Sequence, residues 1–283
     1  MATVKDFSGN TPTWCPGCGD WAIGVAIKSA FSQLGMDPGS VFVGFDIGCS
    51  GNMNDFLNAY AMHTLHGRAI PTSLGMKIAN HEMPTVVIGG DGGLYGEGGN
   101  HFLHACRGNH DITVIVHDNM VYGLTTGQVA PTAKKGTKSK STPGGIVEAS
   151  VNPLALAITQ GATFVSQSFA GDVTHVISMI KEGIQHKGFS LVNILQPCVT
   201  FNKINTYQYY LKRVYKLDNS YDRTSYEAAM AKSAEINEEK FPLGVLYQTS
   251  KQAFHEQLPQ LAERPLVRKD RKNVAEVLLT GFV

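Results

Sequence analysis

One acidic residue stands among glycines near the middle of this 283-residue chain. It is Asp91, which follows the short apolar run 85–88 and lies within the sequence Gly-Gly-Asp-Gly-Gly. Glycines let backbone N–H groups approach a ligand, and the N-terminus of the helix expected at 100–109 attracts anions. A carboxylate at the same point binds a cation. This combination is typical of a site for a metal-bound phosphate.

A second oxygen ligand follows the next apolar run, 112–116. It is Asn119, which lies 28 residues after Asp91. Mg²⁺ prefers carboxylate, amide and carbonyl oxygens, with phosphate oxygens completing its shell. The alternative is a pair of ordinary turn residues, because Asp, Asn and Gly are common at strand ends. A dinucleotide fingerprint is excluded because its third glycine would fall at Tyr95, and the chain has no Gly-Lys-Ser/Thr phosphate loop.

The cysteines form a second group of potential ligands. Cys15 and Cys18 make a C-x-x-C, and Cys49 and Cys198 each follow an expected strand. Four thiolates bind either a tetrahedral zinc or a four-iron cluster, and a C-x-x-C alone also occurs in redox dithiols. The spacing leaves zinc and cluster equally favoured. Cys106 falls within the expected helix 100–109 and is predicted to be a buried, inert thiol.

Short apolar strands alternating with helices must position these side chains. We expect strands at 41–45, 85–88, 112–116, 163–166 and 191–195, and helices at 23–34, 55–62, 72–80, 100–109, 153–160 and 172–186. Strands that are apolar on both faces and separated by helices predict an α/β fold with a doubly wound, mostly parallel sheet. Such sheets bind ligands at the carboxyl ends of their strands. We therefore expect Cys49, Asp91, Asn119 and Cys198 to lie at one edge of the sheet.

Composition limits the classes of partner. The net charge of +1 gives no general attraction to nucleic acid or membranes, and no apolar run approaches the roughly 18 residues of a membrane span. The N-terminus lacks an apolar signal segment, so we expect a cytoplasmic protein. Residues 1–215 should form the ligand-binding domain. The more polar segment 216–283 should be an extension that wraps this core or a partner protein chain.

Taken together, the motifs resemble a known family. Gly-Asp-Gly at 90–92 followed by Asn119 resembles the thiamine diphosphate motif. Between Trp14 and Lys212 the chain closely resembles the beta subunits of 2-oxoacid:ferredoxin oxidoreductases. The segments that carry this resemblance are Trp-Cys-Pro-Gly-Cys-Gly at 14–19, Ile-Gly-Cys-Ser-Gly at 47–51, His-Thr-Leu-His-Gly-Arg-Ala at 63–69, Tyr-Gly-Leu-Thr at 122–125 and Pro-Cys-Val-Thr-Phe-Asn at 197–202.

The resemblance implies a pyrophosphate-type domain of the thiamine diphosphate-binding fold, with three cofactors. Magnesium would be held by Asp91, Asn119 and the backbone carbonyl of Val121. A [4Fe–4S] cluster, rather than zinc, would be held by Cys15, Cys18, Cys49 and Cys198. Thiamine diphosphate would contact Ile47, Gly48, Cys49, Ser50, His66, Gly92, Gly93, Gly123 and Leu124.

The resemblance also implies a reaction and partners. The reaction would be the coenzyme A-dependent oxidative decarboxylation of a 2-oxoacid, either 2-oxoglutarate or pyruvate-like, to acyl-CoA and CO₂, with electrons passing through the cluster to ferredoxin. An alpha subunit would supply the glutamate that activates thiamine and most of the coenzyme A site, so this chain alone should be inactive. Two alternatives are a non-redox thiamine-dependent decarboxylase or synthase component with a structural zinc, and a non-catalytic metal-stabilised scaffold.

Two positions depart from the expected pattern. Thr126 stands where relatives that use 2-oxoglutarate are expected to carry a lysine for the distal carboxylate. A dicarboxylic substrate is therefore not implied by this loop, although Asn-x-x-Asn-Thr-Tyr at 202–207 still resembles those relatives. Gly93 replaces an acid found in many members.

Overall fold

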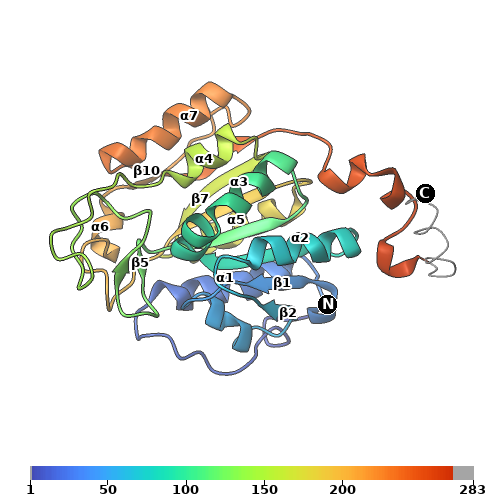
Figure 1. Cartoon of the computed structure of the whole chain (residues 1–283), viewed down its shortest axis with the longest axis horizontal. Coiled ribbons are helices and arrows are strands. Elements are labelled where there is room, and N and C mark those ends of the chain that lie inside the picture. The colour runs from blue at the N-terminus through green and yellow to red at the C-terminus, as the bar shows by residue number, and fades with distance from the viewer. Residues whose placement is uncertain (1, 270–283) are drawn as a thin grey trace, which may run out of the picture.

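The computed structural model describes residues 2–269, which form an eight-stranded sheet with helices on both faces (Figure 1). The strand order is β2-β1-β3-β4-β8-β7-β10-β9. From β2 to β7 all neighbours are parallel, whereas β10 runs antiparallel to β7. The strands are β1 Phe42–Phe45, β2 Tyr60–His63, β3 Thr85–Gly90, β4 Thr113–Asp118, β7 Phe164–Phe169, β8 Ser190–Leu195, β9 Val214–Lys216 and β10 Phe241–Gln248. The expected doubly wound, mostly parallel α/β fold is confirmed.

Two large cores lie on the two faces of the sheet, and a third, smaller one packs Tyr210 of α6 against β7, β8 and β10. On β3, Val86 and Ile88 face one core with helices α1 and α5, whereas Val87 faces the other core with α2, α3, α4 and α7. This alternation follows from side chains pointing to opposite faces along a strand, and it explains why both faces are apolar. The helices are α1 Gly19–Gln33, α2 Ala69–Ala79, α3 Gly99–Gly108, α4 Pro153–Thr159, α5 Val173–Gln185, α6 Tyr207–Leu211 and α7 Tyr226–Ala234.

One expected helix is absent from its position. The helix predicted over 55–62 is wrong, because the chain there forms a 3₁₀ turn, Gly51–Asp55, followed by the edge strand β2. Tyr60 and Met62 are 52% and 50% exposed, so this strand buries neither face well and lacks the apolar signal of an inner strand. It forms because its backbone pairs in parallel with β1, a long-range contact that local propensity does not contain.

The segment after residue 216 contributes to the same sheet. Its apolar patch at 242–247 lies within β10, which pairs with β7 on one side and β9 on the other. Helix α7 packs with α4 and β10 (Figure 1). The division into residues 1–215 and 216–283 remains a prediction, and residues 270–283 lie outside the described part. None of the helices within residues 2–269 combines the length and apolar character that crossing a bilayer requires.

Candidate active site

A pocket opens at the carboxyl ends of β1, β3 and β4. Its walls are the loop after β1, the loop between β2 and α2, the glycine-rich segment after β3, and the hairpin of β5 (Val121–Tyr122) and β6 (Gln128–Val129) that follows β4. Every residue expected to contact thiamine diphosphate or magnesium lies on these walls, so the structure brings together segments that are far apart in sequence. These residues are Ile47, Gly48, Cys49, Ser50, His66, Gly92, Gly93, Gly123 and Leu124, with Asp91, Asn119 and Val121.

Asp91 is almost completely buried at the end of β3, with 1% of its surface exposed. The backbone N–H of Met120 donates to its Oδ2 at 3.0 Å, and the hydroxyl of Thr132 donates to the same oxygen. Burial raises the pKa of this carboxyl well above its ordinary value, and the buried carboxyl of Asp118 raises it further. A cation beside Asp91 would therefore remove an electrostatic cost that the protein alone does not offset.

Asn119 is held in one orientation by its own turn. The backbone N–H of Val121 donates to Asn119 Oδ1 at 3.0 Å, so this atom is the amide oxygen. Between them Met120 adopts φ +62°, a left-handed conformation that closes the turn. Asn202 Nδ2 donates to the Asn119 carbonyl at 2.9 Å and ties the turn to the segment after β8. The turn thus presents an amide oxygen beside the carboxylate of Asp91, a donor pair that suits Mg²⁺.

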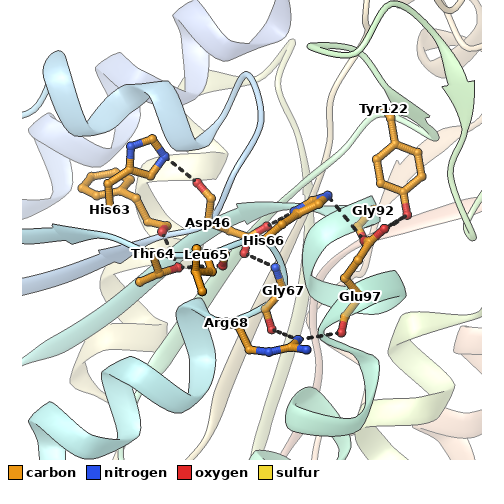
Figure 2. Close-up of polar contacts among 11 residues, drawn as sticks. Asp46, His63, Thr64, Leu65, His66, Gly67, Arg68, Gly92, Glu97 and Tyr122 are labelled. Atoms are coloured by element: carbon orange, nitrogen blue, oxygen red, sulfur yellow. Dashed lines mark hydrogen bonds and ion pairs between the residues drawn. The ribbon is translucent and has the colours of Figure 1, made fainter.

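An imidazole lies at the mouth of the pocket between two acids (Figure 2). His66 Nδ1 is 3.1 Å from Asp46 Oδ2, and its Nε2 is 3.5 Å from Glu97 Oε2. The hydroxyl of Tyr122 donates to the two oxygens of Glu97 at 3.2 and 3.1 Å. Gly67 N–H donates to the other Asp46 oxygen at 2.7 Å, which fixes the carboxylate under the ring. Asp46 and Glu97 thus hold the imidazole ring of His66 so that it faces the glycine-rich wall of the pocket.

Asp46 also explains the glycine at position 93. A Cβ added to Gly93 would lie 1.7 Å from Asp46 Oδ2, so the Asp46 carboxylate occupies the space of any side chain there. Asp46 is fully buried, and burial raises the pKa of its carboxyl. In this chain, therefore, an acid from the β1 loop fills the space beside the glycines of the β3 loop. Sequence reasoning missed this role, although Asp46 directly precedes the predicted contact loop 47–50.

The four predicted cluster ligands line a second cavity of about 250 Å³ beside the pocket. The two spaces share part of a wall, formed by Cys49, Asn119, Gly123 and Leu124. The sulfurs of Cys49 and Cys198 lie 3.5 and 3.7 Å from the point where a Cβ on Gly123 would stand. The four thiols therefore come from the loop before α1, the loop after β1 and the loop after β8. They are Cys15, Cys18, Cys49 and Cys198.

The four thiols around this cavity form a donor set for a metal centre. Both a tetrahedral zinc and a four-iron cluster take four thiolate ligands, so this donor set fits either centre. Within residues 2–269, no three His, Cys, Asp or Glu side chains gather closely enough to hold one metal ion. Burial raises the pKa of Cys18, and it raises the pKa of Cys49 to about 12, so the thiolates need the positive charge of a metal.

The fifth cysteine lies elsewhere. Cys106 is fully buried on α3, in the core shared with α2 and α4, and its pKa is raised by burial. This position confirms the expectation of a buried thiol away from the candidate site. It also makes Cys106 an internal control for cysteine substitutions.

The raised pKa of Asp91 predicts how the stability of the cofactor-free chain depends on pH. The folded state holds this proton more tightly than the unfolded state, where the pKa is about 4. Stability from the protonated acid is complete below about pH 4 and is lost as the pH rises through the raised value. We expect the free energy of unfolding in urea, measured with a chelator present, to be lower at about pH 8 than at about pH 5. Asp91→Asn should flatten this slope, and an unchanged slope would contradict the assignment.

Comparisons with known proteins agree with this geometry. Residues 46–194 match the family model described as "Thiamine pyrophosphate enzyme, C-terminal TPP binding domain". Residues 198–263 match the family model for the C-terminal part of the beta chain of pyruvate ferredoxin oxidoreductase. The first match begins at Asp46 and includes both Asp91 and Asn119, and the second begins at Cys198. The family models thus meet at the cavity described above.

Similar proteins cover most of the chain. It is 43% identical over 266 residues to the 2-oxoacid:ferredoxin oxidoreductase subunit beta of Saccharolobus solfataricus, a match that covers 89% of this chain and 86% of that protein. It is 39% identical over 191 residues to the 2-oxoglutarate synthase subunit KorB of Archaeoglobus fulgidus, covering 68% and 71%. Among solved structures, the 2-oxoglutarate:ferredoxin oxidoreductase from Magnetococcus marinus with 2-oxoglutarate, coenzyme A and succinyl-CoA bound matches with a TM-score of 0.91 and 36% identity, over 98% of this chain and 96% of that chain.

These matches extend well beyond the short motifs. They cover the sheet, both helix layers and the loops that line the pocket. The resemblance seen in the sequence is confirmed at the level of the family and of the thiamine diphosphate-binding domain. The chain belongs to the beta subunits of the 2-oxoacid:ferredoxin oxidoreductase family.

Proposed function

We propose that this chain is the subunit that carries the thiamine diphosphate anchor and the first electron acceptor in the coenzyme A-dependent oxidative decarboxylation of a 2-oxoacid. The products are acyl-CoA, CO₂ and electrons that leave through a [4Fe–4S] cluster to ferredoxin. One observation carries the proposal: the pocket with Asp91 and Asn119 shares a wall with the cavity of four cysteines. An oxidation that releases electrons singly needs an acceptor beside the organic cofactor.

Magnesium and the diphosphate are assigned to the pocket. Asp91, Asn119 Oδ1 and the carbonyl of Val121 would hold Mg²⁺, which removes the electrostatic cost of the buried carboxylate. The glycine loops at 48 and 92–93 would let backbone groups approach the diphosphate. Bound thiamine diphosphate supplies the carbon nucleophile and electron sink for decarboxylation. The protein's own part is to orient that cofactor and to exclude water from it.

A cluster, rather than a structural zinc, is assigned to the cavity. Membership of the 2-oxoacid:ferredoxin oxidoreductase family supports this choice, because electrons that go to ferredoxin need a redox-active centre and zinc has no redox chemistry. Cys49 lies on both the pocket and the cavity, so it would join the two centres through one residue. The alternative, a non-redox thiamine enzyme with zinc, gives no functional reason for the wall that the pocket and the cavity share.

A second protein chain would complete the proposed site. Glu97 contacts His66 and Tyr122 beside the pocket but is not among its lining residues, and none of the lining residues within 2–269 is a glutamate, so we assign the acid that activates the aminopyrimidine of thiamine to another chain. The similar proteins are named as beta subunits, which supports an alpha subunit as the source. We assign to that alpha subunit most of the coenzyme A site, and we expect this chain alone to be inactive.

Anaerobic purification with the alpha subunit tests the proposal. We expect a brown complex with broad visible absorbance, about four irons per beta chain, bound thiamine diphosphate and 2-oxoacid-dependent reduction of ferredoxin. A colourless, zinc-containing complex that binds thiamine diphosphate would favour the non-redox alternative. A complex that binds neither cofactor would leave only the scaffold interpretation.

The contact between Asp46 and His66 predicts that a substitution of Asp46 weakens cofactor binding. Asp46→Asn keeps the acceptor for Gly67 N–H but removes the charge beside His66 Nδ1. A charge-assisted hydrogen bond contributes about 1.5–3 kcal/mol, so thiamine diphosphate should bind roughly tenfold or more weakly in calorimetric titration. Asp55→Asn, at an exposed acid of the neighbouring turn, is the control and should bind normally. Equal affinities in the two variants would remove Asp46 from the site.

Substitutions of Thr126 test whether the enzyme prefers 2-oxoglutarate or pyruvate. Thr126 adopts φ +75° in the exposed turn between β5 and β6, a conformation that costs a β-branched residue strain. Thr126→Lys should raise kcat/KM for 2-oxoglutarate relative to pyruvate by roughly fivefold, the effect of one partly exposed charge pair of about 1 kcal/mol. Thr126→Asn relieves the same strain without adding charge and should leave the ratio unchanged. No change with lysine would place the distal carboxylate elsewhere.

A further inference from the structure

A single buried side chain connects the two proposed cofactor sites. Gln196 follows β8 and is completely buried. Its Oε1 accepts a hydrogen bond from Asn119 Nδ2 at 2.7 Å, and its Nε2 donates to the sulfur of Cys18 at 3.2 Å. We infer that Gln196 is a positioning residue for both centres: it holds the amide of the magnesium ligand and raises the reduction potential of the cluster through its N–H···S bond. This inference rests on the proposed function.

The direction of each hydrogen bond follows from a backbone group. Val121 N–H is only a donor, so the atom of Asn119 that it contacts is the oxygen and the other is the NH₂. That NH₂ must meet an oxygen, so the Gln196 atom facing Asn119 is Oε1. Gln196 Nε2 then faces two acceptors, the Cys18 sulfur and the Pro197 carbonyl at 3.0 Å. Each hydrogen bond in this series therefore points toward the cysteine. Val121 N–H donates to Asn119 Oδ1, Asn119 Nδ2 donates to Gln196 Oε1, and Gln196 Nε2 donates to the Cys18 sulfur.

The packing around Gln196 confines its side chain to this position. The backbone N–H of Gln196 donates to the Asp118 carbonyl at 2.8 Å, which continues the pairing of β8 with β4. On the opposite side, a Cβ added to Gly19 would lie 2.7 Å from Gln196 Cγ. Gly19 begins α1 directly after Cys18, and its N–H donates to the Pro197 carbonyl at 3.2 Å. The absence of a side chain at position 19 therefore gives Gln196 the space to reach the cysteine.

The electrostatics around Cys18 give the sign of the effect. An acid stands on another side of this sulfur, because Asp20 Oδ2 is 3.3 Å from it. Asp20 in turn contacts His117 Nδ1 at 2.6 Å, and both are buried. A donor N–H stabilises the more negative, reduced form of a cluster, whereas a nearby carboxylate opposes it. Removing the Gln196 N–H donor leaves the effect of the Asp20 carboxylate unopposed and should lower the reduction potential of the cluster.

The two ends of the side chain can be separated by substitution. Gln196→Met removes donor and acceptor while keeping a side chain of similar length. We expect a tenfold shift of the cluster's reduction equilibrium toward the oxidised form, which is 59 mV for a one-electron couple, together with about tenfold weaker Mg²⁺-dependent binding of thiamine diphosphate. Gln196→Glu keeps an acceptor for Asn119 but loses the N–H donor. It should lower the potential while leaving thiamine diphosphate affinity near normal.

The experiment uses the anaerobic complex with its alpha subunit. The potential is measured by a redox titration followed by electron paramagnetic resonance, and the affinity by calorimetry with Mg²⁺ and thiamine diphosphate. Gln167→Met is the matched control, because Gln167 is an equally buried glutamine on β7 whose amide contacts Asn193 and Pro242 instead. It should leave both readouts unchanged. Should Gln196→Met not fold, Gly19→Ala displaces the same side chain from outside and should lower the potential.

The possible failures are distinct. If the wild-type complex holds no iron cluster or no thiamine diphosphate, the proposed function fails. If the wild-type complex holds both, and the Gln196 variants keep the wild-type potential and affinity, only the inference about Gln196 is overturned. A loss of affinity without a change in potential would limit Gln196 to the magnesium turn and would likewise overturn the coupling.

Discussion

Asp91→Ala is expected to abolish Mg²⁺-dependent binding of thiamine diphosphate and to leave the iron content of the chain unchanged. Asp91 is the buried carboxylate at the end of β3, and Met120 N–H and Thr132 orient one of its oxygens. Substituting groups that merely support a metal ligand typically costs 10–100-fold in affinity, so loss of the charged ligand itself should exceed about 100-fold. Asp91 does not line the cysteine cavity, which is why the cluster should remain.

Calorimetric titration and an iron assay on the same preparation check this result. Asp91→Asn is a graded control, since it keeps an oxygen near the magnesium but removes the charge, and it should bind with intermediate affinity. Retained binding in Asp91→Ala would remove the acid from the magnesium site. Loss of both thiamine diphosphate and iron would show that the two sites do not form independently.

Cys198→Ser is expected to have the complementary effect, with loss of the cluster and retention of thiamine diphosphate binding. Cys198 is 8% exposed in the loop after β8, and its sulfur lies beside Gly123 and Cys49. Serine is a poor ligand for iron, so iron should fall from about four per chain to a small fraction of that value. Absorbance and iron content measure the loss, and 2-oxoacid-dependent reduction of ferredoxin should cease.

The control for this substitution is in the same chain. Cys106→Ala removes a buried sulfur from the opposite core, far from the cavity in the fold, and should lower the thermal midpoint without changing the iron content. A Cys198→Ser protein that keeps all its iron would exclude this cysteine as a ligand. Equal iron loss in both variants would indicate that the cluster is lost through general instability.

The sheet and its functional edge were predictable because they depend on local signals and one topological rule. Asp91 and Asn119 follow strongly apolar strands, and parallel strands place their carboxyl ends together. Two other strands were not predictable in the same way. β2 has two half-exposed residues and depends on pairing with β1. β10 is apolar, but a proline and a glycine interrupt its strand signal, and it depends on pairing with the distant β7.

The contacts between site residues could not be predicted from the sequence, for a different reason. The resemblance indicated which residues meet the cofactors, but Asp46, Glu97 and Gln196 act through other side chains. Their roles depend on which groups the folded chain brings within hydrogen-bonding distance, and sequence spacing carries no such information. The signals that exist are weak: Asp46 precedes a glycine loop, and Gln196 precedes a cysteine by two positions.

The cysteine cavity has a consequence for biosynthesis. Three of its ligands lie within the first 49 residues, whereas the fourth follows β8, a central strand paired between β4 and β7. At translation rates of roughly 5–20 residues per second, the ribosome needs about 7–30 seconds to travel from Cys49 to Cys198. Throughout that interval the nascent chain exposes three thiols without their partner. Delivery of the proposed cluster would therefore be a late event, and the three thiols would need protection from oxygen until the centre of the sheet has closed.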